Sequence, residues 1–248
     1  MLSKLPRQTL AGQAAENLIE YIEANNLQPG DILPSASQLA SSFGVSRPVI
    51  REALRSLAGK DMIDVVNGKG AIIKPVDSNP LRSFFRRAIT FDKDTVIELL
   101  EVRKGLEFQT ASLAAERRTD KELAQMHHDI TEMREAMRDP ARCIEFDLQF
   151  HLRIARATRN SMLYYLLESI RDATKNTILK GRRSRTTVDE LERVQVLHEM
   201  IYAAIEAGDP QQAGNAMMMH FDEAVLAVAR SETQAERATE DRTSQKRP

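Results

Sequence analysis

Four side chains of the types that bind metal ions recur at helical spacings in the second half of the sequence. Asp147 and His151 are four residues apart, so both lie on one face of a helix, and the apolar residues around them predict that this face points inward. His198 precedes a glycine-containing turn at 208–209 by ten residues, and His220 follows it by eleven. In an antiparallel helix pair both imidazoles would lie at about the same level, roughly 15 and 16.5 Å from the turn.

Three imidazole nitrogens and one carboxylate make a mixed nitrogen and oxygen site that suits a divalent metal ion. We expect Zn²⁺, with Ni²⁺ or Mn²⁺ as alternatives, and room for an oxygen atom from water or a ligand. One alternative is three separate core histidines, each satisfied by hydrogen bonds. Another is the catalytic ion of a metal-dependent hydrolase. Against it, no H-E-x-x-H arrangement supplies a base, and four protein ligands leave less open coordination than the usual three.

A second group of residues could bind DNA. Arg47, Arg51 and Arg55 recur every four residues between Gly44 and Leu57, and the apolar residues among them fit the spacing of a buried helix face. The three arginines therefore share the outward face. Arg47, nearest the start of the helix, could donate two hydrogen bonds to a guanine edge, whereas Arg51 and Arg55 could contact phosphates. The alternative is an ordinary solvated helix face.

Signals for helix ends place this arginine helix inside a helix-turn-helix. A first helix is expected over residues 10–23. Ser35, three residues before Gln38, predicts a capping box that opens a short second helix. Ser46 predicts the N-cap of the arginine helix, with Pro48 in its first turn, where a missing amide donor costs little.

The segment MIDVVNGKGAIIK, residues 62–74, predicts a two-stranded wing. Its two β-branched runs are joined by NGKG, where asparagine and glycine tolerate the positive φ of a tight hairpin. A lysine between glycines at the tip could approach the DNA backbone or the minor groove. The predicted DNA-binding residues are Ser35, Ser37, Ser46, Arg47, Pro48, Arg51, Arg55, Asn67, Gly68 and Lys69.

Composition predicts a mainly α fold, with an N-terminal winged helix-turn-helix and a C-terminal all-helical bundle. The chain of 248 residues is 42% hydrophobic, lacks Trp and is rich in helix formers. Two prolines at 74–80 mark a linker. We expect a DNA-binding domain over 1–76, a helical effector-binding and dimerisation domain over 77–230, and a disordered tail over 231–248. The bundle helices are predicted over 81–90, 94–117, 120–138, 142–158, 161–182, 187–207 and 210–231.

Charge and cysteine content narrow the partners and the compartment. The net charge is −1, and residues 1–77 carry eight Lys and Arg against eight Asp and Glu, so DNA binding must depend on the local placement of charge. The single cysteine, Cys143, cannot form an internal disulfide, and the N-terminus lacks the apolar run of a signal peptide. No stretch approaches the roughly 20 apolar residues that span a bilayer. We therefore expect a cytoplasmic protein without a membrane partner.

Residues 27–73, LQPGDILPSASQLASSFGVSRPVIREALRSLAGKDMIDVVNGKGAII, resemble the DNA-binding domain of GntR-family transcription regulators. The resemblance implies that Arg47, Arg51 and the wing glycines serve DNA binding. One departure is Ala36-Ser37, where family members often carry Glu-Arg. Serine cannot replace the charged contact of that arginine, so operator sequence or affinity is expected to differ from that of relatives.

Residues 81–228 resemble the effector-binding domain of the FadR subgroup of that family, through LLEVRKGLEFQTASLAAER, FDLQFHLRIARATRNSML and LHEMIYAAIEAGDPQQAGNAMMMHF. The resemblance implies a divalent metal that helps to bind a small carboxylate effector. The ligands that it implies are Asp147, His151, His198 and His220. It also implies that Arg103 points towards the acidic ligand; the alternative is a salt bridge from Arg103 to Glu101 or Glu107 on the same helix.

These observations predict a ligand-responsive transcription regulator. We expect a repressor that binds a palindromic operator in double-stranded DNA as a homodimer, because one winged helix covers only a short half-site. A small organic acid bound near the metal would release it from DNA. The alternative is a metal-sensing regulator, in which the ion itself is the signal.

Overall fold

The computed structural model describes residues 9–91, 95–185 and 187–244 of a chain that forms two compact units, Met1–Pro80 and Leu81–Pro248. Within the described ranges the chain is mainly helical, with one two-stranded antiparallel sheet. The expected fold class, a winged helix-turn-helix followed by an all-helical bundle, is confirmed.

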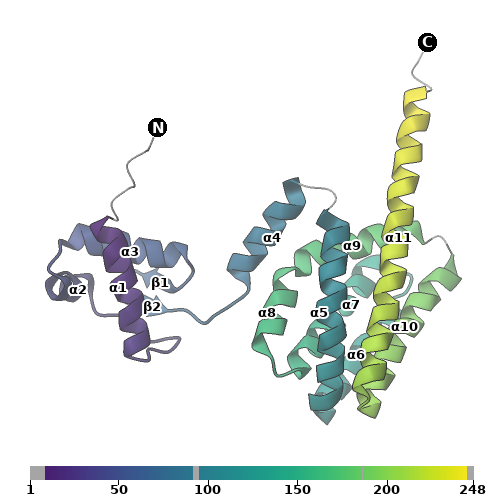
Figure 1. Ribbon diagram of the computed structural model, residues 1–248, viewed down its shortest axis with the longest axis horizontal. Helices are drawn as coiled ribbons and strands as arrows, with labels where there is room; N and C mark the ends of the chain where they lie inside the picture. The colour runs from purple at the N-terminus through teal and green to yellow at the C-terminus, as the bar shows by residue number, and fades with distance from the viewer. Residues whose placement is uncertain (1–8, 92–94, 186, 245–248) are drawn as a thin grey trace. The chain divides into compact units, whose positions relative to one another are not determined.

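The first unit is built from three helices and a hairpin around one core (Figure 1). Its elements are α1 (Leu10–Ala24), α2 (Ala36–Phe43), α3 (Arg47–Gly59), β1 (Ile63–Val66) and β2 (Gly70–Ile73). Both α1 and α2 pack against α3, so the apolar face of the arginine helix is covered. Side chains with 1% exposure or less in this core are Leu18, Ile50, Ala53, Leu57 and Ile63.

Both ends of α2 form as their residue types require. The hydroxyl oxygen of Ser35 accepts a hydrogen bond from the Gln38 backbone N–H at 3.3 Å, and Gln38 Oε1 accepts one from the Ser35 N–H at 2.9 Å, which completes the predicted capping box. Gly44 ends α2 with φ 64°, a left-handed conformation in which glycine avoids the penalty of a Cβ atom.

Ser46 occupies the N-cap position of α3, but its side chain accepts no capping hydrogen bond, so that part of the prediction is wrong. The reason lies in the next residues. Pro48 removes one of the two amide donors that a capping hydroxyl uses, and the other, on Val49, donates to the Ser46 carbonyl at 3.1 Å. The exposed Ser46 hydroxyl thus remains available beside Arg47.

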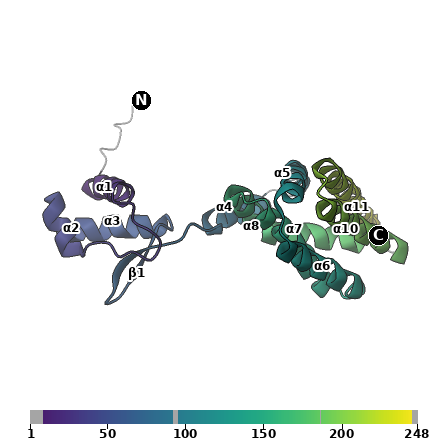
Figure 2. The same cartoon turned by 90° about the horizontal axis from the view of Figure 1, so that it is seen from below.

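The predicted wing is present as the hairpin of β1 and β2. The strands pair antiparallel, with Val66 opposite Gly70. The backbone φ angles of Gly68 and Gly70 are 80° and 98°, and residues other than glycine rarely adopt such positive values. Ile32 adds an isolated bridge to β2. Figure 2 shows the hairpin projecting from the helices of this unit.

The remainder of the described chain is an all-helical bundle. Its helices are α4 (Asn79–Phe91), α5 (Thr95–Arg117), α6 (Asp120–Glu135), α7 (Pro140–Ala157), α8 (Ser161–Ser169), α9 (Arg171–Ser184), α10 (Val188–Ala207) and α11 (Pro210–Ser244). The long helices α5 and α11 lie side by side (Figure 1), and α11 also packs against α9 and α10. No helix in the described ranges is both long and apolar enough to cross a membrane.

Two expectations for this bundle differ from the structure. The single helix expected over 161–182 is two helices, α8 and α9, because the chain turns at Ile170, whose side chain is 2% exposed in a small core cluster. The burial of Ile170 against other helices ends α8 at a point where the sequence has no glycine or proline. The segment from Ser231, expected to be a disordered tail, continues α11 to Ser244; its alanine, glutamate and arginine content favours a helix. Residues 245–248 of that expected tail lie outside the described ranges.

A close contact fixes α11 against α5. At Gly214 an added Cβ would lie 2.5 Å from Cε2 of Phe108 and 2.7 Å from Oγ of Ser112, so only glycine fits without movement. This contact is less than two turns before His220 and sets the level at which α11 presents that histidine to the core.

Candidate metal centre and DNA-binding surface

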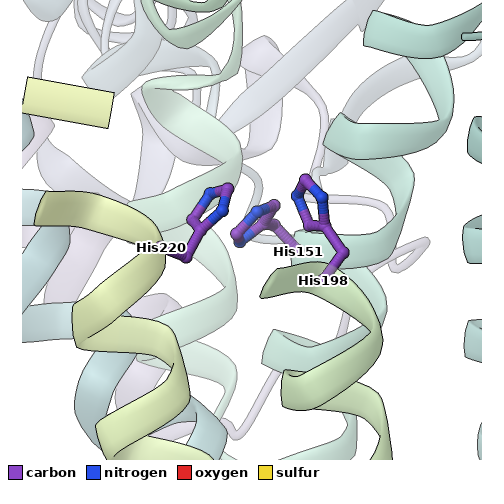
Figure 3. A group of neighbouring side chains, drawn as sticks. All are labelled: His151, His198 and His220. Carbon is purple, nitrogen blue, oxygen red and sulfur yellow. The ribbon is translucent and has the colours of Figure 1, made fainter. Parts of the chain in front are cut away.

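Three histidines from three helices meet in the core of the second unit: His151 on α7, His198 on α10 and His220 on α11 (Figure 3). One ligand nitrogen from each residue lies within 4.8 Å of the other two. The rings of His198 and His220 have centroids 4.4 Å apart, so the mirrored spacing about the 208–209 turn does bring these imidazoles together.

Four imidazole nitrogens of this cluster have no hydrogen-bond partner among the described residues. His151 Nε2, both ring nitrogens of His198 and His220 Nδ1 are buried and unpartnered. A buried polar atom without a partner costs free energy, which a bound cation would remove. The alternative of three separate histidines, each satisfied by its own hydrogen bonds, is therefore wrong.

Asp147 lies against the same cluster. One carboxylate oxygen is 3.4 Å from His198 Nε2, and the other is 3.8 Å from His151 Nε2. Burial alone would raise the pKa of this carboxyl group, but the neighbouring His198 and His151 hold it well below its usual range, so Asp147 is ionised. The side chain provides a carboxylate beside three nitrogen ligands.

His220 is held in the form that can bind a metal ion. Burial, followed by the neighbouring His198 and His151, lowers the pKa of His220 well below 6.5. The ring is therefore neutral near pH 7 and keeps a lone pair for a cation. Neutral imidazoles with one carboxylate form a donor set that fits a divalent ion such as Zn²⁺.

The first unit presents the predicted arginines on one exposed face of α3. Arg47 and Arg51 are exposed and make no ion pair among the described residues. Arg55 is exposed too, but its Nη1 is 2.6 Å from Oε2 of Glu52, which offsets part of its charge. The unpaired positive charge of this face is therefore greatest at the N-terminal end of α3.

The other predicted DNA contacts are also on the surface of this unit. Ser37 is exposed in the first turn of α2, and Asn67, Gly68 and Lys69 are exposed at the tip of the wing. Ser35 is exposed as well, although its oxygen already accepts the capping hydrogen bond. Its hydroxyl hydrogen remains available to donate.

Two family models match the chain. The model described as bacterial regulatory proteins, gntR family, matches residues 10–73, and the FCD domain model matches residues 98–223. The chain belongs to the GntR family. It is a DNA-binding transcription regulator with an FCD effector domain, and this membership assigns it to regulators rather than to metal-dependent hydrolases.

Relatives of this GntR-family chain include the HTH-type transcriptional regulator LutR of Bacillus subtilis, which is 36% identical over 204 residues, or 81% of this chain and 92% of LutR. The galactonate operon transcriptional repressor of Escherichia coli is 29% identical over 199 residues, which cover 77% of this chain and 84% of the repressor. The solved structure of Streptococcus agalactiae GntR has a TM-score of 0.67 and 29% identity, and the match covers 88% of this chain and 99% of that one.

Glu107 connects the histidine cluster of this GntR-family protein to α5. Its Oε2 is hydrogen-bonded to His151 Nδ1, which leaves His151 Nε2 facing the cluster. Burial alone would raise the pKa of Glu107, but Arg103 and His151 hold it below its ordinary value. A carboxylate that holds the far nitrogen of a metal-binding histidine fixes its orientation and raises its basicity. The sequence indicated Glu107 only as an ion-pair partner, and its contact with α7 could not be read from spacing.

Arg103 forms the ion pair that was the alternative to its predicted role. Its Nε donates to Glu107 Oε1 at 2.8 Å, and its Nη2 is 2.7 Å from the same oxygen. The guanidinium carbon also lies 4.8 Å from the ring centroid of Phe221. Arg103 is 5% exposed and lines a cavity beside the histidines, so the ion pair and the position facing the cavity coexist.

Two small cavities, of about 40 and 50 Å³, adjoin the cluster. His198 lines the first, and His220 lines the second. Four residues line both: Asp147, Ile178, Arg185 and Val194. Both walls combine apolar side chains with a few charged groups.

Proposed function

We propose that this GntR-family regulator is a repressor that is released from its operator by a small organic acid, which binds in the FCD domain beside a divalent metal ion. The observation that carries the proposal is the group of buried, unpartnered nitrogens of His151, His198 and His220 next to the ionised Asp147. These residues would hold the ion, with Zn²⁺ the first choice and Ni²⁺ or Mn²⁺ the alternatives. When bound, the ion supplies positive charge for the oxygen atoms of an acid.

An acid is the ligand class that the cavity residues favour. Arg103 and Arg185 line the second cavity, so guanidinium groups are present to offset the desolvation of a buried carboxylate. Apolar walls at Ile178 and Val194 suit a short carbon chain. The name of one relative, the galactonate operon repressor of Escherichia coli, refers to a sugar acid and to repression, which supports both parts of the proposal.

DNA binding by the first unit follows the predicted division of roles. Arg47 reads a base edge from the N-terminus of α3, and Arg51 and Arg55 contact phosphates. The wing tip at 67–69 contacts the backbone or the minor groove. Two chains bind a palindromic operator as a homodimer, because doubling a short half-site multiplies affinity and specificity. Effector binding then acts through the segment 74–80 on the spacing or mobility of the two DNA-binding domains.

A thermal-shift screen of small carboxylates tests the proposal. The purified protein is measured with and without Zn²⁺ against acetate, L-lactate and D-galactonate. A ligand that binds only the native state raises the melting temperature, so an acid effector should do so, and more strongly in the presence of metal. A protein that responds to none of these acids in either condition would contradict an acid effector at this site.

The second candidate is a metal sensor, which is favoured by the four protein donors that surround the site. Removal of metal by a chelator, followed by an operator-binding assay, separates the two. A sensor loses or gains DNA affinity in step with free metal. The acid-responsive repressor keeps its operator affinity and loses its response to the acid.

A further inference from the structure

We propose that Arg185, at the C-terminal end of α9, is the residue that binds the carboxylate of the effector, and that Arg103 is a positioning residue for Glu107. The inference rests on the proposed function, because it requires an acid in this domain. It gives different roles to the two arginines that line the second cavity.

The charge of Arg103 is already balanced. Two of its nitrogens lie within 2.8 Å of Glu107 Oε1, and both side chains are at most 6% exposed. Glu107 in turn is hydrogen-bonded to His151 Nδ1. An acid that took Arg103 as its partner would have to compete with this buried carboxylate. Arg103 therefore acts through Glu107 on the orientation of His151.

Arg185 is in the opposite situation. Its Nε is a buried donor without a hydrogen-bond partner, and its side chain makes no ion pair with any residue in the described ranges. Burial lowers the pKa of Arg185 from its usual value, and Glu223 and Asp147 act on it only through longer-range attraction. A buried guanidinium N–H without a partner is stabilised by an anion that accepts its hydrogen bond.

The position of Arg185 matches that of a ligand-binding residue. It lines both cavities together with Asp147; His198 also lines the first cavity, and His220 also lines the second. Ile178 and Val194 form an apolar wall common to both. A carboxylate on Arg185 therefore lies beside the histidine cluster, with the carbon chain of a short acid against these two side chains.

Gly181 lies beside this guanidinium, close enough for an added side chain to make an ordinary van der Waals contact with it. A Cβ atom at Gly181 would lie 3.4 Å from Nη1 of Arg185 and 3.6 Å from Cβ of Ala227 on α11. Gly181 and Arg185 line the same cavity. The planar guanidinium of Arg185 can give an acid two parallel hydrogen bonds, which lysine cannot.

Calorimetric titration of the Zn²⁺-loaded full chain with acetate, L-lactate and D-galactonate tests the inference. We expect Arg185→Gln to weaken binding of any acid that binds the wild type by roughly 10- to 100-fold, the loss of a charge-assisted hydrogen-bond pair. Arg171→Gln is the matched control: Arg171 is also on α9, lines neither of the two cavities and forms an ion pair with Glu145 on α7. Its acid affinity should stay near that of the wild type.

Melting temperatures of the metal-free proteins give a second readout. Arg103→Gln should lower the melting temperature, because it leaves Glu107 buried without its cation, whereas Arg185→Gln should leave it unchanged or raise it, because it removes an unpaired buried charge. An Arg185→Gln variant that binds the acid as tightly as the wild type overturns the inference alone. A wild type that binds none of the acids overturns the proposed function with it. A fall in the melting temperature of metal-free Arg185→Gln would show a structural role instead.

Discussion

Replacement of Glu107 by glutamine tests whether this carboxylate organises the metal centre. Glu107 is 2% exposed, and the variant keeps its shape while it leaves Arg103 buried without an anion. Breaking a buried ion pair on one side costs about 3–5 kcal/mol. Each kcal/mol shifts the melting temperature of a domain of this size by roughly 2–4 °C, so the metal-free variant should melt roughly 6–20 °C lower.

The same variant should also bind metal more weakly. Glutamine can still accept a hydrogen bond from His151 but carries no charge to raise the basicity of the ring, and loss of such a partner typically costs roughly 10- to 100-fold in metal affinity. Competition with a chromogenic zinc chelator, below the melting temperature of the variant, measures this. Glu101→Gln, an exposed glutamate on the same helix, is the control. Equal zinc affinity and equal melting temperatures for both variants would refute the role of Glu107.

Three further predictions concern DNA binding, packing and pH. Arg47→Ala should cost about 1–3 kcal/mol and relax preference at one operator position, measured by fluorescence anisotropy on operator variants; a uniform loss across sequences would assign Arg47 to a phosphate. Gly214→Ala should lower the free energy of unfolding by about 1–3 kcal/mol in urea titrations, because its Cβ meets Phe108, whereas Gly105→Ala, with open space around it, should not destabilise; equal stability would contradict the close packing. The pKa of His220 is lower in the folded chain than in the unfolded chain, so below pH of about 6.5 the unfolded state binds the extra proton. The stability of the metal-free protein should therefore be fully present above that pH and fall as the pH drops, and His220→Gln should flatten this fall; a slope unchanged by the substitution would contradict the assignment.

Local signals in the sequence were sufficient for much of the fold. Capping at Ser35 and the glycine-tipped hairpin depend on residues close in sequence, so their geometry follows from short-range rules. The approach of His198 and His220 was predictable as well, because both distances are counted from one tight turn. The helix break at Ile170 was not, because burial against other helices decides it.

The parts of the site that sequence could not give depend on contacts between distant helices. Glu107 on α5 meets His151 on α7, and no periodicity within either helix predicts that contact. Arg185 resembles its neighbouring arginines in the sequence, and only the packing around it shows that its Nε has no partner. The ion pair of Arg55 with Glu52, in contrast, follows the i, i+3 rule and was predictable from the sequence.

The affinity of the Zn²⁺-loaded protein for its operator, measured by fluorescence anisotropy during titration with an acid that raises its melting temperature, tests the central claim most directly. The account predicts that operator affinity falls as the acid saturates the FCD domain, and that Arg185→Gln shifts this response to higher acid concentrations. An operator affinity that stays constant for every acid that binds would contradict it.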